Sequence, residues 1–298
     1  MKTSTSKRLR WNVAIWLAAG LFMTSTAGMA SGPILPDPKA EARHQPQVEE
    51  TANGISLVNI TAPSSGGVSR NEYETFNVPD KGAILNNSYT LSKTELAGYV
   101  QGNNNMAERP AKIIVNEVTG AGSTSMDGFL EVAGNRADVV IANPNGITVN
   151  GGGFINTGKA FLTTGKPIYD DRDNLQNLAV TGGLVDIEGK GLNGKEADSL
   201  AILSRAVKIN AGIWAKDLHI TTGANTVDAK TLEASAIEGK GGRPAFALDT
   251  AAIGGMYAGR ITLVGTEKGL GVNNSGVWSA EDNLTLDWNG DLKNSGTI

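Results

Sequence analysis

The chain has 298 residues, of which 38 are glycine, 19% are charged, 5% are aromatic and none is cysteine. Disulfides therefore cannot stabilise the fold, and a cysteine nucleophile is excluded. This fits either a large core that needs no covalent link or a chain that must thread a pore unfolded. The formal net charge of −4 becomes −8 without residues 1–30, which hold four basic and no acidic residues. Such a balance argues against nucleic acid as a partner.

The first thirty residues have the pattern of a secretory signal peptide. Four basic residues lie between Lys2 and Arg10, an apolar run extends from Val13 to Met23, and small residues follow at Gly28–Ala30. The apolar run is short for a bilayer span, which makes a membrane anchor the weaker alternative. We expect the Sec export machinery to recognise residues 1–30 and a peptidase to remove them.

The next segment, residues 31–51, is rich in Pro, Gln and Glu and has no periodicity. It is predicted to be a flexible mature N-terminus. From residue 52 onward, short apolar pieces alternate with turns rich in Gly, Asn and Ser. Strands are expected at Ile55–Val58, Tyr73–Val78 and Ala111–Val118. Only Ser92–Tyr99 has a weakly helical pattern.

Residues 143–158, NPNGITVNGGGFINTG, combine asparagine and glycine with very short apolar pieces. Both residue types tolerate positive φ, and glycine disfavours helix, so the pattern predicts tight turns between strands. The strands are expected at Gly146–Asn150 and Phe154–Thr157. Asn-Pro starts a turn, and Asn145 and Gly146 are expected to supply positive-φ positions in it.

Three related segments follow later: GIWAKDLHI from Gly212, GMYAGRITL from Gly255 and GVWSAEDNLTL from Gly276. The glycines are 43 and 21 residues apart, so the first interval is close to two copies of the second. A period near twenty with alternating strands is typical of a solenoid whose coils must stack on one another. The residues expected to point inward are Ile213, Leu218, Ile220, Ile261, Leu263, Leu284 and Leu286.

The sequence therefore predicts an all-β fold, a right-handed parallel β-helix with short extra-helical strands or hairpins and an N-terminal cap. Strand composition excludes a helical solenoid, and no leucine-rich repeat frame recurs. The chain stops within the pattern at GDLKNSGTI without the polar cap that a solenoid needs. We expect it to be the N-terminal part of a longer protein.

Several segments together resemble one known family. They are GFLEVAGNRADVVIANPNGITVNGGGFINTGKAFLTTGKP from Gly128, NEVTG at Asn116–Gly120, AKDLHITTGANTVD at Ala215–Asp228 and GGMYAGRITLVGTEKGLGVNNSGV at Gly254–Val277. They resemble the secretion domain of two-partner secretion exoproteins, which include filamentous haemagglutinins, haemolysins and contact-dependent growth inhibition proteins of Gram-negative bacteria. The resemblance implies a secretion domain over residues 52–265 and the start of haemagglutinin-type β-helical repeats over residues 266–298.

Two short motifs mark this family's secretion domain. The second, NPNGI, is intact in this sequence as Asn143, Pro144, Asn145, Gly146 and Ile147. The first is usually NPNL, and the matching residues are Asn103, Asn104, Asn105 and Met106. Asn104 lacks the fixed φ of proline, which loosens the expected turn. Whether the NPNGI motif contacts a transporter or only shapes a turn stays open at this point.

The resemblance also implies partners and a location. A cognate outer-membrane transporter recognises such a domain through its periplasmic POTRA domains, and edge-strand addition is the expected mode. The domain then nucleates β-helix folding at the cell surface, so the protein reaches the surface or the medium through the periplasm. The whole protein is expected to be a contact-dependent growth inhibition toxin or a filamentous haemagglutinin-like adhesin. Its target-cell receptor would be contacted only by parts beyond this chain.

The sequence offers few candidates for a catalytic or metal site. Its two histidines are His44, in the segment expected to be flexible, and His219, at an outward strand position where a solvated side chain is expected. The acidic run Asp170–Asp173 lacks the glycine and distal glutamate of an EF-hand and is expected to be a solvated loop. Glu117 is a candidate buried acid with a structural hydrogen-bonding role, although strand alternation leaves its face open.

The alternative to a secretion domain is a β-helix enzyme that acts on polysaccharide, of the pectate-lyase type. Such an enzyme needs carboxylates that bind Ca²⁺, or paired acids, on one exposed sheet. The repeats place Thr, Lys, Asn and Asp at outward positions without a recurring acid pair. We therefore expect no enzymatic activity, no catalytic residue, no bound metal and no cofactor.

Overall fold

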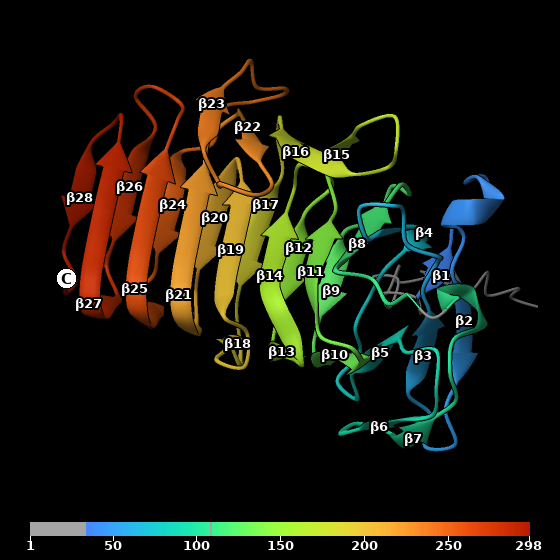
Figure 1. The fold of residues 1–298 in the computed structure, drawn as a ribbon. Coiled ribbons are helices and arrows are strands. Elements are labelled where there is room, and N and C mark those ends of the chain that lie inside the picture. Colours follow the sequence, from blue (N-terminus) through green and yellow to red (C-terminus); the bar gives the residue numbers. More distant parts are fainter. Residues whose placement is uncertain (1–33, 108) are drawn as a thin grey trace, which may run out of the picture. The chain divides into compact units, whose positions relative to one another are not determined.

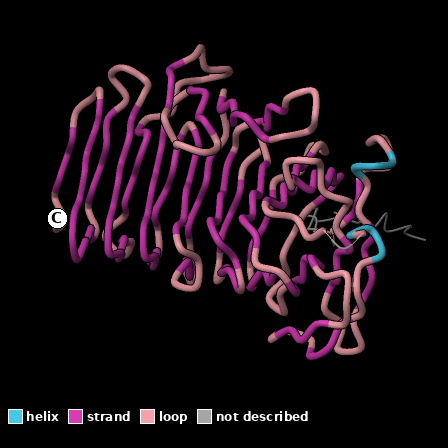
Figure 2. Tube along the Cα trace, in the orientation of Figure 1, coloured by secondary structure: helices cyan, strands magenta, loops and turns pink. Residues whose placement is uncertain are grey.

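The computed structural model describes residues 34–107 and 109–298, which belong to one compact unit. The predicted signal peptide lies outside the described residues. Strands dominate this unit, and its helices are two short 3₁₀ turns, η1 (Ala42–His44) and η2 (Asn104–Met106) (Figures 1 and 2). Within the described residues, no helix has the length and apolarity that a membrane crossing requires.

The largest sheet has fifteen strands and extends along the whole stack. Its strands are β1 (Leu35–Pro36), β2 (Gln47–Glu50), β3 (Ser56–Asn59), β4 (Val68–Thr75), β5 (Ala83–Asn87), β8 (Ile113–Val118), β10 (Phe129–Gly134), β11 (Ala137–Ala142), β13 (Gly152–Ile155), β14 (Thr157–Thr163), β18 (Leu192–Gly194), β19 (Ser199–Ser204), β21 (Gly212–Thr222), β25 (Gly255–Gly265) and β27 (Val277–Trp288). This sheet contains two rows of shorter strands, and the two rows merge in the long strands β21, β25 and β27.

A second sheet of seven strands closes the coils on the other side. Its strands are β9 (Thr124–Met126), β12 (Ile147–Val149), β17 (Leu184–Ile187), β20 (Ala206–Ile209), β24 (Phe246–Thr250), β26 (Gly271–Asn274) and β28 (Leu292–Asn294). Every pairing within it is parallel, and apolar side chains from both sheets fill the interior. The chain is therefore a parallel β-helix, which confirms the predicted fold.

The coils have two lengths. Along one line of paired residues, the chain advances by 24, 40, 21, 43 and 22 residues from coil to coil, through Phe129, Gly153, Asn193, Trp214, Tyr257 and Ser279. The interval of 43 residues between the first two sequence repeats is therefore a single coil, because β21 pairs directly with β25. Treating it as two coils was wrong.

The long coils owe their length to excursions that form a separate antiparallel sheet. This sheet contains β15 (Lys166–Tyr169), β16 (Leu175–Val180), β22 (Asn225–Asp228) and β23 (Ala234–Ala236), in that order. One excursion supplies β15 and β16, and a later coil supplies β22 and β23. The central pairing, β16 with β22, thus joins two coils outside the stack (Figure 1). The predicted extra-helical strands are confirmed.

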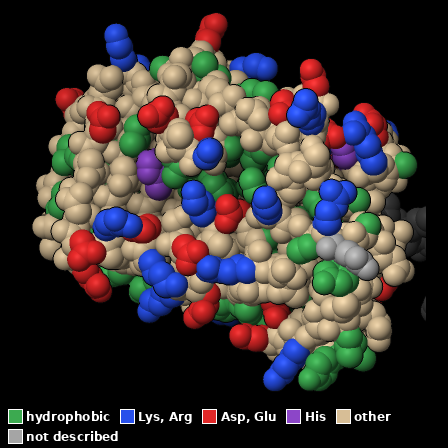
Figure 3. Space-filling view, viewed as in Figure 1, with side chains coloured by type: hydrophobic (Ala, Val, Ile, Leu, Met, Phe, Trp, Pro, Cys, Tyr) green, Lys and Arg blue, Asp and Glu red, His purple; other side chains and the backbone are tan. Residues whose placement is uncertain are grey.

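The segment with a helical pattern is a hairpin instead, formed by β6 (Ser92–Thr94) and β7 (Gly98–Val100). The turn between them is held by Glu131 of β10, whose carboxylate accepts hydrogen bonds from the amides of Glu95 (2.7 Å) and Leu96 (2.9 Å). Gly98 then adopts a φ of 71°, which ends any helical path. The prediction of a helix was wrong because the contact with Glu131 joins residues that are distant in the sequence, and a local pattern cannot show it. Exposed Tyr89, Leu91 and Tyr99 give the hairpin region its apolar surface, at the lower right of Figure 3.

The segment expected to be flexible is ordered from residue 34 to residue 50. Strand β1 pairs antiparallel with β4, and β2 pairs antiparallel with β3, so both cover the first coil of the stack. Ile34 and His44, both in this capping segment, are buried. The prediction of flexibility was wrong here. The segment has no periodicity of its own, and its order comes from pairing with strands of the β-helix.

Most of the residues predicted to point inward do so. Ile213, Leu218, Ile220, Ile261 and Leu263 are buried, whereas Leu284 is half-buried and Leu286 is exposed in the last coil. The third repeat is also shifted by one position. Trp278 pairs with Met256 and points inward, whereas the aromatic residues of the other two repeats, Trp214 and Tyr257, pair with each other on the outer face.

Candidate functional site

The NPNGI motif forms the corner between β11 and β12. The amide of Gly146 donates to the carbonyl of Asn143 at 3.1 Å, which closes a turn whose exposed tip is Pro144 and Asn145. Gly146 has a φ of 116°, as expected. Asn145 does not have a positive φ, since the described non-glycine residues that do are Ala107, Asn156, Asp173 and Leu232. That expectation was wrong: proline at the second position is compatible with type I and type II turns, and the absence of a positive φ at Asn145 corresponds to type I.

The side chain of Asn143 is completely buried and bonded at both ends. Its Oδ1 accepts from the amide of Asn145 at 2.9 Å. Its Nδ2 donates to the carbonyl of Gly122 at 2.9 Å and to Oγ1 of Thr124 at 3.0 Å. Asn143 therefore stabilises its own turn and also attaches it to the segment before β10.

Asn145 adds a second attachment to the same segment. Its Nδ2 donates to the carbonyl of Gly120 at 2.8 Å, and the bond lies at the exposed edge of the corner. Ile147, directly after the turn, is buried between Thr124 of β9 and Val185 of β17 in the second sheet. The motif thus fixes the point at which the chain turns from one sheet into the next.

The first motif builds the same arrangement around Asn103. Its Oδ1 accepts from the amide of Asn105 at 3.0 Å, and the amide of Met106 donates to its carbonyl at 3.2 Å. Its buried Nδ2 donates to the carbonyls of Ile60 (2.8 Å) and Asn86 (2.9 Å). Asn105 Nδ2 donates to the same Ile60 carbonyl at 3.1 Å.

The two motifs therefore share one hydrogen-bonding scheme. In each, the first asparagine accepts from the amide two residues on and donates to an earlier part of the chain, and the third residue adds a parallel bond. Asn104 and Pro144 occupy equivalent, exposed positions at the second place. The substitution of Asn104 for proline leaves the arrangement of bonds intact.

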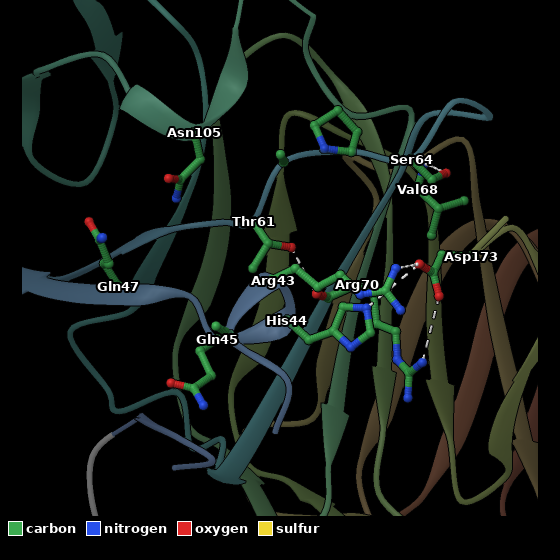
Figure 4. Close-up of a pocket in the computed structure, with 13 residues that line it drawn as sticks. Arg43, His44, Gln45, Gln47, Thr61, Ser64, Val68, Arg70, Asn105 and Asp173 are labelled. Carbon is green, nitrogen blue, oxygen red and sulfur yellow. Dashed lines mark hydrogen bonds and ion pairs between the residues drawn. The ribbon is translucent and has the colours of Figure 1, made fainter. Parts of the chain in front are cut away.

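A cluster of charged and aromatic side chains joins the N-terminal cap (residues 34–50), the β-helix and the extra-helical sheet. Arg70 Nη2 lies 2.9 Å from Glu72 Oε1 and 3.5 Å from Glu117 Oε2, and its guanidinium lies 4.2 Å from the centre of the Tyr169 ring. His44 Nδ1 reaches the same Glu72 oxygen at 3.0 Å. Figure 4 shows Arg70 and His44 side by side at one wall of a cavity of about 420 Å³.

The buried acid predicted at Glu117 is part of this cluster. Burial raises the pKa of the Glu117 carboxyl above its ordinary value, and the charge of Arg70 partly offsets that effect. Tyr169 Oη donates a long bond to it at 3.4 Å, and burial raises the pKa of that phenol as well. Apart from Arg70 Nε, which is buried without a hydrogen-bond partner among the described residues, these groups contact one another, so the arrangement fits a structural clasp.

Sequence reasoning missed the roles of His44 and Asp173 in this clasp. Both lie in segments without periodicity, and their partners are distant in the chain. Arg43 Nη1 lies 2.5 Å from Asp173 Oδ2, so the acidic loop contacts the cap and is not merely solvated. His219 does point outward, but it is half-buried and lies 2.9 Å from Oγ1 of Thr221. Residues 34–107 and 109–298 contain no group of three or more His, Cys, Asp or Glu side chains arranged to hold a metal ion.

The comparisons with known proteins agree with this geometry. The family model described as the TPS secretion domain matches residues 33–296. The chain therefore belongs to the secretion domain family of two-partner secretion proteins. Members of this family are secreted exoproteins of Gram-negative bacteria, displayed at the cell surface, and their secretion domain is not a catalytic one.

Two curated relatives and one solved structure give the similarity in detail. The chain is 46% identical over 262 residues to the 16S rRNA endonuclease CdiA of Enterobacter cloacae, and 45% identical over 272 residues to the toxin CdiA of Yersinia pestis. These matches cover 87% and 90% of this chain but 8% of each relative. The crystal structure of the filamentous hemagglutinin secretion domain superimposes with a TM-score of 0.74 at 29% identity, over 90% of this chain and 99% of that one.

Proposed function

We propose that a cognate outer-membrane transporter recognises this chain while the chain is extended, and that its folding begins after passage. The observation that supports this is the burial of Asn103 and Asn143, whose polar atoms are bonded inside the folded domain. A transporter that reads these side chains has to meet them before the coils close. An extended chain also offers unpaired backbone groups to a strand edge of periplasmic POTRA domains.

The direction of the motif bonds supports a role in nucleating the fold. Asn103 and Asn105 donate to residues that precede them in the chain, and so do the side-chain amides of Asn143 and Asn145. Each corner can therefore dock on chain that has already emerged. Every coil added buries apolar surface worth about 25 cal/mol per Å², which favours further outward movement.

The whole protein is proposed to be a contact-dependent growth inhibition toxin or a filamentous haemagglutinin-like adhesin. The support is the similarity to the two CdiA proteins and to the filamentous hemagglutinin secretion domain. The chain spans about 8% of the length of those curated relatives. In this proposal it binds and directs export without catalysing a reaction, and any toxic or receptor-binding activity lies in other parts of the protein.

Export with and without the transporter tests the first step. We expect the chain to accumulate in the medium only when the cognate transporter is co-expressed, and equal secretion without it would contradict the proposal. A cysteine pair tests whether the chain passes unfolded. Thr262 and Thr285 are directly paired on β25 and β27, so Thr262→Cys with Thr285→Cys can form a disulfide between neighbouring coils.

The disulfide should arrest export in an oxidising periplasm, and reductant should restore it. The two single-cysteine variants are the matched controls, and both should be exported normally. Accumulation in the medium, at the wild-type level, of chain whose disulfide had already formed in the periplasm would show that a closed coil can pass. That outcome would overturn recognition and passage in the extended state.

A further inference from the structure

Two aromatic side chains lie side by side on the outer face of the stack. Trp214 of β21 and Tyr257 of β25 are directly paired, their ring centres are 6.2 Å apart, and their planes differ by 15°. Each ring lies against glycine backbone: a Cβ on Gly212 would come within 2.5 Å of the indole, and one on Gly255 within 2.8 Å of the phenol. Each ring therefore lies over the glycine of its own strand, and the two rings have nearly parallel planes on neighbouring coils.

The surroundings of this pair are polar and carry both signs of charge. The rings line a shallow depression of about 690 Å³ together with Lys195, Lys216, Asp217, Arg260, Glu281 and Asp282. Arg260 Nη2 donates to Asp217 Oδ2 at 2.6 Å, which holds both side chains beside the rings. Acidic and basic side chains alternate around the depression, so it does not favour a ligand of one strong charge.

Covering glycine is a structural role that other aromatic residues of the chain also have. Phe129 covers Gly153 of the neighbouring strand, without another aromatic ring stacked beside it among the described residues. The indole N–H groups also differ. Trp278 donates to Thr250 Oγ1 and Trp288 to the carbonyl of Leu270, whereas Trp214 has no acceptor in the described part of the chain. Trp214 thus keeps a donor for a ligand.

We propose that Trp214 and Tyr257 form a binding platform for a neutral polysaccharide. A pyranose ring has an apolar face of C–H groups that stacks on a flat aromatic ring, and the two aromatic rings on neighbouring coils offer two such contacts along a sugar chain. Asp217 and Arg260 supply an acceptor and donors for the hydroxyl groups at the edge of the sugar. The Trp214 N–H adds another donor.

A protein partner fits this surface less well. Tryptophan, tyrosine and arginine do dominate protein interfaces, but as anchors in deep, fully desolvated pockets. Here both rings line a shallow depression that extends over neighbouring coils of the stack. A linear polymer matches that shape. The platform also exists only after neighbouring coils have stacked, so it serves the folded, surface-exposed chain.

Affinity electrophoresis of the secreted chain tests the platform, with hydroxyethyl cellulose, galactomannan and dextran in separate native gels. We expect at least one polysaccharide to retard the wild-type chain, and Trp214→Ala and Tyr257→Ala to weaken that binding about tenfold or more. Tyr257→Phe keeps the flat ring and should retain most of the affinity. Phe129→Ala removes an equivalent cover from a glycine elsewhere and should bind as the wild type does.

Circular dichroism and thermal unfolding of every variant show whether the fold survives, and the comparison of Tyr257→Ala with Tyr257→Phe keeps the test decisive if Trp214→Ala unfolds. Migration of the wild-type chain that none of the three polysaccharides retards would overturn the proposal. So would full retention of binding in a folded Tyr257→Ala variant. Loss of POTRA-domain binding in Trp214→Ala, with no retardation by polysaccharide, would assign the surface to a protein partner instead.

Discussion

The two asparagine corners of this domain have the same hydrogen bonds but differ in the residues between and after the asparagines. The corner at Asn143–Ile147 has proline at its second position and a glycine with a φ of 116° at its fourth. The corner at Asn103–Met106 has asparagine at its second position and a buried methionine at its fourth, and the following residue, Ala107, has a φ of 40°. The comparison shows that the first and third asparagines carry the geometry, while the other positions adjust how the chain leaves the turn.

Removing the first asparagine should have the largest effect at either corner. Asn143→Ala breaks two side-chain donor bonds, one of them fully buried, and two acceptor bonds, and leaves the Gly122 carbonyl and the Asn145 amide without those partners. We expect a loss of about 3 kcal/mol in the free energy of unfolding, and a similar loss for Asn103→Ala. Urea unfolding monitored by circular dichroism measures both. A loss at only one corner would show that the shared scheme does not carry equal weight.

Gly146→Val tests the position at which the corners differ most. Its φ of 116° excludes a β-branched residue, and a Cβ there would lie 3.1 Å from the carbonyl oxygen of Leu184. We expect destabilisation of about 2 kcal/mol by the same unfolding measurement. Gly122→Val is the matched control, since a Cβ there meets nothing within 4 Å. Equal stability of the two variants would contradict the role assigned to the turn.

Asn145→Ala should cost less, about 1 kcal/mol, because its bonds to Gly120 and Asn143 lie at the exposed edge. This variant separates a turn-shaping role from transporter contact. If the motif only shapes the turn, secretion falls in proportion to stability, and Gly146→Val is worse in both measurements. If the transporter reads Asn145, export is lost while the purified domain melts almost normally. A stable and fully secreted variant would exclude that side chain as a contact; Asn104→Ala serves as the exposed control.

Asn104→Pro should make the first corner more like the second. The preceding Asn103 has φ −81° and ψ 115°, the extended conformation that a residue before proline adopts. Asn104 is the first residue of η2, where a missing amide N–H is tolerated. We expect a gain of about 0.5 kcal/mol, since proline restricts the unfolded chain. A loss of stability in thermal unfolding would mean that the two corners differ in backbone at this position.

The sequence predicted the β-helix because stacking leaves a local trace: short alternating strands and turns rich in Gly and Asn. It predicted the turn at Asn143–Gly146 for the same reason. It did not predict that β21 and β25 are neighbours, because the excursion between them lengthens one coil to nearly twice the common interval. The sequence also did not predict the one-position shift of Trp278, because that shift depends on the register in which β27 pairs with β25.

The parts that sequence reasoning missed depend on distant partners. The cap over residues 34–50 pairs with β3 and β4, and the hairpin turn after β6 is held by Glu131. His44 meets Glu72 only once the cap has closed. Motif residues were easier to place than their bonds: both asparagine corners were identified, but the carbonyls that they reach lie 17 to 45 residues earlier.

The extra-helical sheet has a mechanical consequence for the stack. Its central strands pair Val180 with Asn225, so residues that belong to different coils are fastened together outside the helix. A force that peels the stack from β27 breaks one coil interface at a time, first against β25 and then against β21. At β22 the load is shared with β16, and several rows of hydrogen bonds have to break together. The extra-helical sheet is therefore the place along the stack at which unravelling under tension meets added resistance.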